Sequence, residues 1–148
     1  GVTRPVSLLR VDEQVPGQRV MSQANARTLI SLLESVIYEG TGSRAAIPGY
    51  RVAGKTGTAR KAKDGERGYE TNRYVGVFGG IAPASNPRLA AVVVIDDPRN
   101  SRYYGGEVAA PVFSAVVGGA LRLMGVAPDA GLQDSADPLT GVATMVAR

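Results

Sequence analysis

The chain has 148 residues, of which 44% are hydrophobic, and it carries a formal net charge of +4. This length allows one hydrophobic core and is short for two domains. Cysteine and histidine are both absent, which rules out disulfides and histidine-based triads, so neither a metal nor a cofactor is expected. The chain has no tryptophan and two phenylalanines, and no aromatic residues alternate regularly with its basic ones, so nucleic acid is not an expected partner.

The N-terminal part predicts a lead-in followed by one helix. Residues 1–20 contain two prolines and predict an irregular segment with one short strand. Ser22 is a suitable N-cap for a helix that runs to about Glu39. Gly40 and Gly42 end it, because glycine adopts the left-handed C-terminal conformation at little cost. Six apolar positions form one stripe with i, i+3, i+4, i+7 spacing. They are Ala26, Leu29, Ile30, Leu33, Val36 and Ile37.

Three strands are predicted in the middle of the chain, at residues 50–59, 74–82 and 89–95. Residues 61–73 are too polar for a core and predict a hairpin connection with its exposed tip at Asp64 and Gly65. Short links favour antiparallel neighbours. The third strand is apolar on both faces, which predicts a central position or a cover of helices.

A second helix is predicted at residues 109–124, with Pro111 in its first turn. Residues 108–121 carry no charge, so this helix is expected to be buried on most sides. Gly118 and Gly119 would let it lie close to the sheet. Residues 126–148 have little periodicity and predict a flexible C-terminal tail.

The predicted fold is therefore α/β (α+β), an antiparallel sheet flanked by helices. Two helices do not cover both faces of such a sheet completely. Further strands or helices are expected to complete it.

One stretch concentrates chemistry: residues 54–59 read Gly-Lys-Thr-Gly-Thr-Ala. A lysine flanked by hydroxyls suits a carboxylate or a phosphate. Residues 49–56 match the phosphate-loop pattern G-x-x-x-x-G-K-T, which would make the chain a nucleotide hydrolase. That loop requires a buried strand before it and a helix that starts at the lysine. Neither is predicted, because residues 50–59 favour a strand and a charged turn follows.

The alternative interpretation places Lys55, Thr56 and Gly57 on a strand. K-T-G accompanies S-x-x-K and S-D-N in penicillin-recognising serine enzymes. Around this motif the sequence resembles the C-terminal half of class B penicillin-binding proteins, in particular the division-specific peptidoglycan D,D-transpeptidases of Gram-negative bacteria. The resemblance covers roughly residues 1–129. The segments that carry it are residues 4–9, 52–59, 78–84, 92–98 and 103–113.

The resemblance implies the C-terminal portion of a penicillin-binding-protein/β-lactamase-like transpeptidase fold over residues 1–125. In this family a serine attacks a D-Ala-D-Ala stem peptide, and an amine of a second stem takes the acyl group to cross-link septal peptidoglycan. β-Lactams acylate the same serine. The implied location is the periplasmic face of the bacterial inner membrane. The implied partners are the stem peptide, β-lactam antibiotics, the N-terminal part of the same protein, and membrane proteins of the divisome.

The family's site residues transfer to positions that match its motifs. The resemblance makes Lys55 catalytic. Thr56 and Thr58 lie on one face of a strand, where both hydroxyls can donate to a substrate carboxylate. The Thr58 backbone N–H is implied as an oxyanion-hole donor, and Gly57 leaves room for a strand-like substrate. An aromatic rim with a glycine in its loop completes the expected substrate and β-lactam site: Tyr74, Tyr103, Tyr104 and Gly105.

The sequence departs from the family in one respect. None of its nine serines begins S-x-x-K, and no S-x-N tripeptide occurs. In the family both motifs precede K-T-G, so the nucleophile is expected upstream of this chain, and the chain alone is expected to be inactive. The alternative is a non-catalytic binding module that keeps the same fold.

Overall fold

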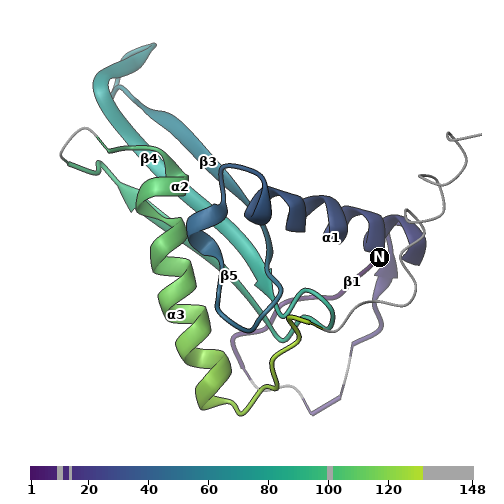
Figure 1. Cartoon of the computed structure of the whole chain (residues 1–148). Helices are drawn as coiled ribbons and strands as arrows, with labels where there is room; N and C mark the ends of the chain where they lie inside the picture. The colour runs from purple at the N-terminus through teal and green to yellow at the C-terminus, as the bar shows by residue number, and fades with distance from the viewer. Residues whose placement is uncertain (10–11, 14, 100–101, 132–148) are drawn as a thin grey trace, which may run out of the picture.

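The computed structural model describes residues 1–9, 12–13, 15–99 and 102–131. Its centre is a three-stranded antiparallel sheet in the order β3-β4-β5, as Figure 1 shows. The bounds are β3 (Ala53–Ala62), β4 (Tyr69–Ala82) and β5 (Leu89–Asp96). The predicted antiparallel hairpins are confirmed.

The first hairpin is longer than predicted, because its charged residues pair as strand and leave residues 63–68 as the exposed turn. At the other end β3 begins at Ala53, whereas the sequence predicted a start at residue 50. Tyr50 instead forms an isolated bridge with Ile47. Arg51 donates its backbone N–H to Asp129, so these residues form tertiary contacts in place of a strand ladder.

Helix α1 (Gln23–Tyr38) confirms the first predicted helix. The Ser22 hydroxyl accepts a hydrogen bond from the Asn25 N–H at 3.0 Å, which satisfies one of the free donors at the helix start. The predicted apolar stripe is partly or fully buried except at Leu29, which is 45% exposed. Glu34 also lies on the buried side of the helix, with 8% exposure.

The last helix, α3 (Ala110–Leu123), follows a separate short helix, α2 (Gly105–Val108), that was not predicted. The expectation that α3 is buried on most sides is wrong within the described residues, because Val116 is 62% and Leu123 92% exposed. Its buried positions are Ala110, Phe113, Val117, Gly118 and Leu121. The two glycines do not bring α3 onto the sheet. A methyl group at Gly118 would meet Ile47, and one at Gly119 would meet nothing within 4 Å.

The core lies between α3 and one face of the sheet (Figure 1). Phe78 from β4 and Phe113 from α3 are fully buried there, with ring centroids 4.8 Å apart and ring planes tilted by 60°. Burying such a pair contributes several kcal/mol, since removing one buried phenylalanine ring costs about 3–5 kcal/mol.

The opposite face of the sheet is exposed at β5. Val92 and Val94 are 71% and 58% exposed, while Val93 and Ile95 pack on the core. The prediction that β5 is central is therefore wrong for the described residues, since β4 is central and β5 is an edge strand. The predicted cover of helices is present on one face only, where α3 packs against β5.

The lead-in contains two short strands where one was predicted. They are β1 (Val2–Thr3) and β2 (Gln18–Arg19), which pair antiparallel. A single-turn 3-10 helix, η1 (Ser43–Ala45), connects α1 toward β3. Within the part of the chain that the structure describes, no helix has both the length and the apolar character needed to cross a membrane. Of the expected tail, residues 132–148 lie outside the described residues.

Candidate functional site

The Lys-Thr-Gly-Thr tetrad lies in β3, and the sheet register assigns its side chains to two faces. Thr56 pairs with Phe78, and Thr58 pairs with Gly76. Directly paired residues of antiparallel strands point to the same face. The two threonines therefore share one face of the sheet, as predicted. That face is the core face, at the end where α2 begins. Lys55 belongs to the opposite face.

Both threonine hydroxyls have hydrogen-bond partners. Thr56 Oγ1 lies 2.8 Å from Thr41 Oγ1, in the loop after α1. Thr58 Oγ1 accepts the backbone N–H of Gly105 at 3.1 Å. The Lys55 ammonium group reaches back to Thr56 and donates to its carbonyl oxygen at 3.1 Å and to its hydroxyl at 3.2 Å. The cation is thus within hydrogen-bond distance of the Thr56 hydroxyl.

A pocket of about 340 Å³ opens beside these hydroxyls. Its wall combines β3 with the loop after α1 and the start of α2. The lining residues are Thr41, Ser43, Arg44, Thr56, Thr58, Tyr104, Gly105, Gly106 and Glu107. The hydroxyls and the arginine are donors suited to an anion, and Glu107 adds one negative charge. Among the described residues, no group of three acidic, cysteine or histidine side chains could hold a metal ion.

The three predicted tyrosines come together. Tyr74 and Tyr103 stack with ring centroids 4.0 Å apart and an interplanar angle of 13°. Tyr103 and Tyr104 have centroids 4.5 Å apart, and the Tyr103 hydroxyl donates to that of Tyr104 at 3.4 Å. This hydrogen bond, with the neighbouring phenols, raises the pKa of Tyr103. Of the three, only Tyr104 is among the residues that line this pocket.

Glycines around the pocket serve different needs. A methyl group at Gly105 would overlap the carbonyl oxygens of Gly57 and Val77, so a residue with a side chain cannot start α2 this close to the sheet. A methyl group at Gly106 would overlap the carbonyl oxygen of Thr41. At Gly57 the same addition meets one neighbour, Val77 Cβ, at an ordinary 3.6 Å. Packing within the described residues therefore does not require a glycine at position 57.

Sequence reasoning missed Thr41, which belongs to the pocket through its contact with Thr56. It also missed a polar cluster of Glu34, Arg51, Ser85 and Asp129 near the start of β3. The two carboxylate residues of this cluster, Glu34 and Asp129, are buried. The position of Glu34 could have predicted part of this cluster, because a carboxylate on the buried side of an amphipathic helix needs a polar partner. No local pattern marks Thr41, Ser85 or Asp129.

The geometry does not fit a phosphate loop. In such a loop the lysine begins a helix whose N–H groups face the phosphates. Here Lys55 lies within β3, two residues after its first residue, and the chain continues as strand to Ala62. The first helix after it in the described residues is α2, at Gly105.

Comparison with known proteins assigns the family. Residues 1–118 match the family described as "Penicillin binding protein transpeptidase domain". The chain belongs to the penicillin-binding protein transpeptidase family. Its mixed α/β fold is the fold of these transpeptidase domains. The apo transpeptidase domain of penicillin-binding protein 3 from Burkholderia pseudomallei superposes with a TM-score of 0.71 and 45% identity, covering 82% of this chain and 37% of that one.

Two similar proteins support the same family assignment. The peptidoglycan D,D-transpeptidase FtsI of Escherichia coli K12 is 51% identical over 131 residues, which are 88% of this chain and 22% of that protein. The probable peptidoglycan D,D-transpeptidase PbpC of Pseudomonas aeruginosa is 46% identical over 132 residues, 88% of this chain and 23% of that protein. The chain therefore spans less than a quarter of the length of these relatives.

Proposed function

We propose that this chain forms one wall of the active site of a serine D,D-transpeptidase that cross-links peptidoglycan stem peptides during septal wall synthesis and is acylated by β-lactams. The observation that carries the proposal is the Lys-Thr-Gly-Thr strand, with Lys55 within hydrogen-bond distance of Thr56 and both threonine hydroxyls in one pocket. A carboxylate at that pocket would meet two hydroxyl donors beside a positive charge.

The hydrogen bonds leave these hydroxyls able to donate. Thr58 Oγ1 accepts from the Gly105 N–H, so its own proton is available to a ligand. If Thr41 donates to Thr56, the Thr56 proton is available too, because a hydroxyl can accept and donate at once. In this proposal both protons bind the terminal carboxylate of a D-Ala-D-Ala stem, or the carboxylate of a β-lactam. The Thr58 backbone N–H is proposed as one oxyanion-hole donor.

Strand geometry supports a peptide substrate. In the described sheet, β3 pairs with β4 on one side and with no other strand on the other. An extended peptide can align with such an edge. Gly57, which the packing of this chain does not require, keeps that approach free of a side chain. Tyr104, with Tyr103 and Tyr74 behind it, is proposed as the aromatic rim.

The nucleophilic serine and its lysine are proposed to lie upstream in the same protein. Lys55 shares its sheet face with Val92 through the row Lys55–Gly79–Val92. Since Lys55 must lie near the nucleophile, we place the rest of the transpeptidase domain against this exposed apolar face. The full protein is proposed to act at the periplasmic face of the inner membrane with divisome proteins, and residues 1–148 alone are expected not to react with penicillin.

The test is acylation of the full-length protein by labelled penicillin. Lys55→Ala is expected to reduce acylation by about two orders of magnitude or more, because it removes a charge next to the reacting groups. Lys63→Ala is the matched control, since Lys63 lies in the hairpin turn and contacts Glu66. Undiminished acylation of Lys55→Ala would contradict the assignment. Failure of the wild-type protein to react would favour the non-catalytic binding module.

A further inference from the structure

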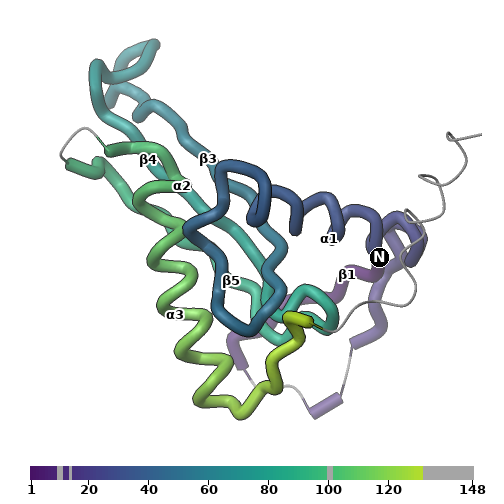
Figure 2. The backbone as a smooth tube through the Cα atoms, in the orientation of Figure 1, coloured from purple at the N-terminus to yellow at the C-terminus, as the bar shows by residue number. Residues whose placement is uncertain are grey.

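Residues 126–130, which follow α3, pack against the rest of the described chain. Residues 126–130, here called the C-terminal strap, run back past the segment before β3 and the turn between β4 and β5, as the yellow end of the tube in Figure 2 shows. The Tyr50 hydroxyl donates to the carbonyl of Val126 at 2.7 Å. The Asp129 amide and the one after it both donate to the carbonyl of Gly49 at 3.1 Å.

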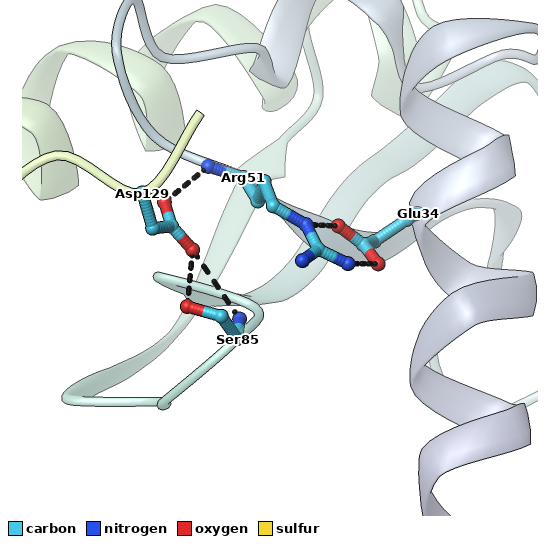
Figure 3. Close-up of polar contacts among 4 residues, drawn as sticks. All are labelled: Glu34, Arg51, Ser85 and Asp129. Carbon is cyan, nitrogen blue, oxygen red and sulfur yellow. Dashed lines mark hydrogen bonds and ion pairs between the residues drawn. The ribbon is translucent and has the colours of Figure 1, made fainter. Parts of the chain in front are cut away.

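The Asp129 side chain is the buried end of the strap. It is 4% exposed, and both carboxylate oxygens accept hydrogen bonds (Figure 3). Oδ1 accepts the backbone N–H of Arg51 at 2.7 Å. Oδ2 accepts the hydroxyl of Ser85 at 2.5 Å and its backbone N–H at 3.3 Å. Hydrogen bonds of this kind offset the cost of burying a carboxylate, and a neutral side chain would not satisfy all three donors.

Arg51 makes hydrogen bonds to at least three other segments of the described chain. The backbone N–H of Arg51 donates to Asp129 of the strap. The backbone carbonyl of Arg51 accepts the N–H of Ala84, in the turn between β4 and β5, at 2.8 Å. Its guanidinium group makes two parallel hydrogen bonds of 2.8 Å to the carboxylate of Glu34 on α1, the geometry that favours arginine over lysine (Figure 3). Movement of Arg51 would break bonds to all three segments.

Arg51 lies four residues before Lys55. The residues between them have no free space: Val52 and Ala53 are 0% and 1% exposed, and a methyl group at Gly54 would lie 2.6 Å from Phe78. A buried, extended segment transmits a displacement from one end to the other, because close packing prevents the segment from bending or shortening. The position of Arg51 therefore determines where β3 presents Lys55 and the two threonines.

We infer that the C-terminal strap is a positioning device for the Lys-Thr-Gly-Thr strand, with Asp129 as its principal positioning residue. The strap belongs to the functional domain, which extends beyond residue 125. Its effect on catalysis rests on the proposed function, whereas its effect on the motion of β3 does not. Two measurements on the full-length protein separate these: amide hydrogen exchange and acylation by labelled penicillin.

The test variant is Asp129→Asn, which keeps the shape but turns an amide NH₂ toward donors that needed an acceptor. We expect faster exchange in peptides from residues 50–60, unchanged exchange in β5, and acylation slower by roughly ten-fold. Glu34→Gln is expected to act in the same direction through the Arg51 side chain. The control is the full-length protein truncated after Gly131. This variant keeps the strap and is expected to match the wild-type protein in both measurements.

The outcomes are distinct. Exchange that rises equally in β3 and β5 would reduce the strap to a general stabiliser and overturn the proposal, as would wild-type exchange and acylation in Asp129→Asn. Local acceleration around residues 50–60 with slower acylation supports it. If the wild-type protein is not acylated at all, the proposed function fails, and the exchange comparison still decides whether the strap holds β3.

Discussion

The hydroxyl of Thr56 is shared between Lys55 and Thr41, and this sharing sets its orientation. Lys55 donates to Thr56 Oγ1 at 3.2 Å, while Thr41 Oγ1 lies 2.8 Å away. Two hydrogen-bond partners at fixed positions restrict the directions in which the Thr56 O–H bond can point. In the proposed function this proton binds a carboxylate, so Thr41 contributes to affinity without being a K-T-G residue.

Thr41→Val tests this contribution, because valine keeps the shape of threonine and removes its hydroxyl. We expect the non-covalent affinity of the full-length protein for a β-lactam to fall by about five-fold, which corresponds to about 1 kcal/mol for one hydrogen bond, with the acylation step itself little changed. Stopped-flow measurement of the two constants separates affinity from acylation. Thr28→Val is the control, since the Thr28 hydroxyl bonds within α1 to Ala24. Equal effects of the two variants would contradict the role of Thr41.

At the scale of one element, β3 contains two glycines with different reasons to be glycine. A methyl group at Gly54 would lie 2.6 Å from the Phe78 ring and 2.7 Å from the Gly79 carbonyl oxygen, inside the core. One at Gly57 would make an ordinary contact of 3.6 Å with Val77. The fold therefore requires the first glycine, and the proposed substrate requires the second.

Alanine at each position separates these requirements. Gly54→Ala is expected to destabilise the full-length protein by about 1–3 kcal/mol through overpacking, measured as a lower thermal midpoint. Gly57→Ala is expected to keep the wild-type midpoint and lose acylation, because under the proposed function its methyl group would obstruct the substrate strand beside β3. A Gly57→Ala protein that is acylated at the wild-type rate would show that no peptide or β-lactam approaches β3 at this position.

The elements also show what a sequence can and cannot predict here. The strand that carries Lys55 and the capped helix at Ser22 follow from local alternation and spacing, and the structure has both. The contact between Thr41 and Thr56 joins residues 15 apart, and that between Arg51 and Asp129 joins residues 78 apart. No periodic pattern encodes such contacts, because they depend on how finished elements pack.

The errors have a related cause. Residues of β5 and α3 are apolar on more than one side, which predicted burial, yet Val92 and Val116 are largely exposed in this chain. An apolar side chain indicates that a residue suits a buried position. The structure shows that the described part of this chain alone has no neighbour to cover that position. The difference between the two indicates a surface that fits an apolar neighbour.

At the scale of the whole molecule, the exposed face of β5 adjoins Lys55 through the sheet register. Val92 is 71% exposed, on the face to which Lys55 belongs. Under the proposed function the upstream part of the transpeptidase domain covers this face and brings its serine to Lys55. A charge placed there would then be buried without a partner, at a cost of several kcal/mol.

Val92→Asp in the full-length protein is therefore expected to lower both the thermal midpoint and the acylation rate. Thr71→Asp is the matched control, because it places the same charge in an exposed strand position of β4 near the hairpin turn, and it is expected to change neither by much. If Val92→Asp behaves like Thr71→Asp, the face stays open to water in the full-length protein. The serine would then have to reach Lys55 from the free edge of β3 alone, and the proposed arrangement of the two parts of the domain would be wrong.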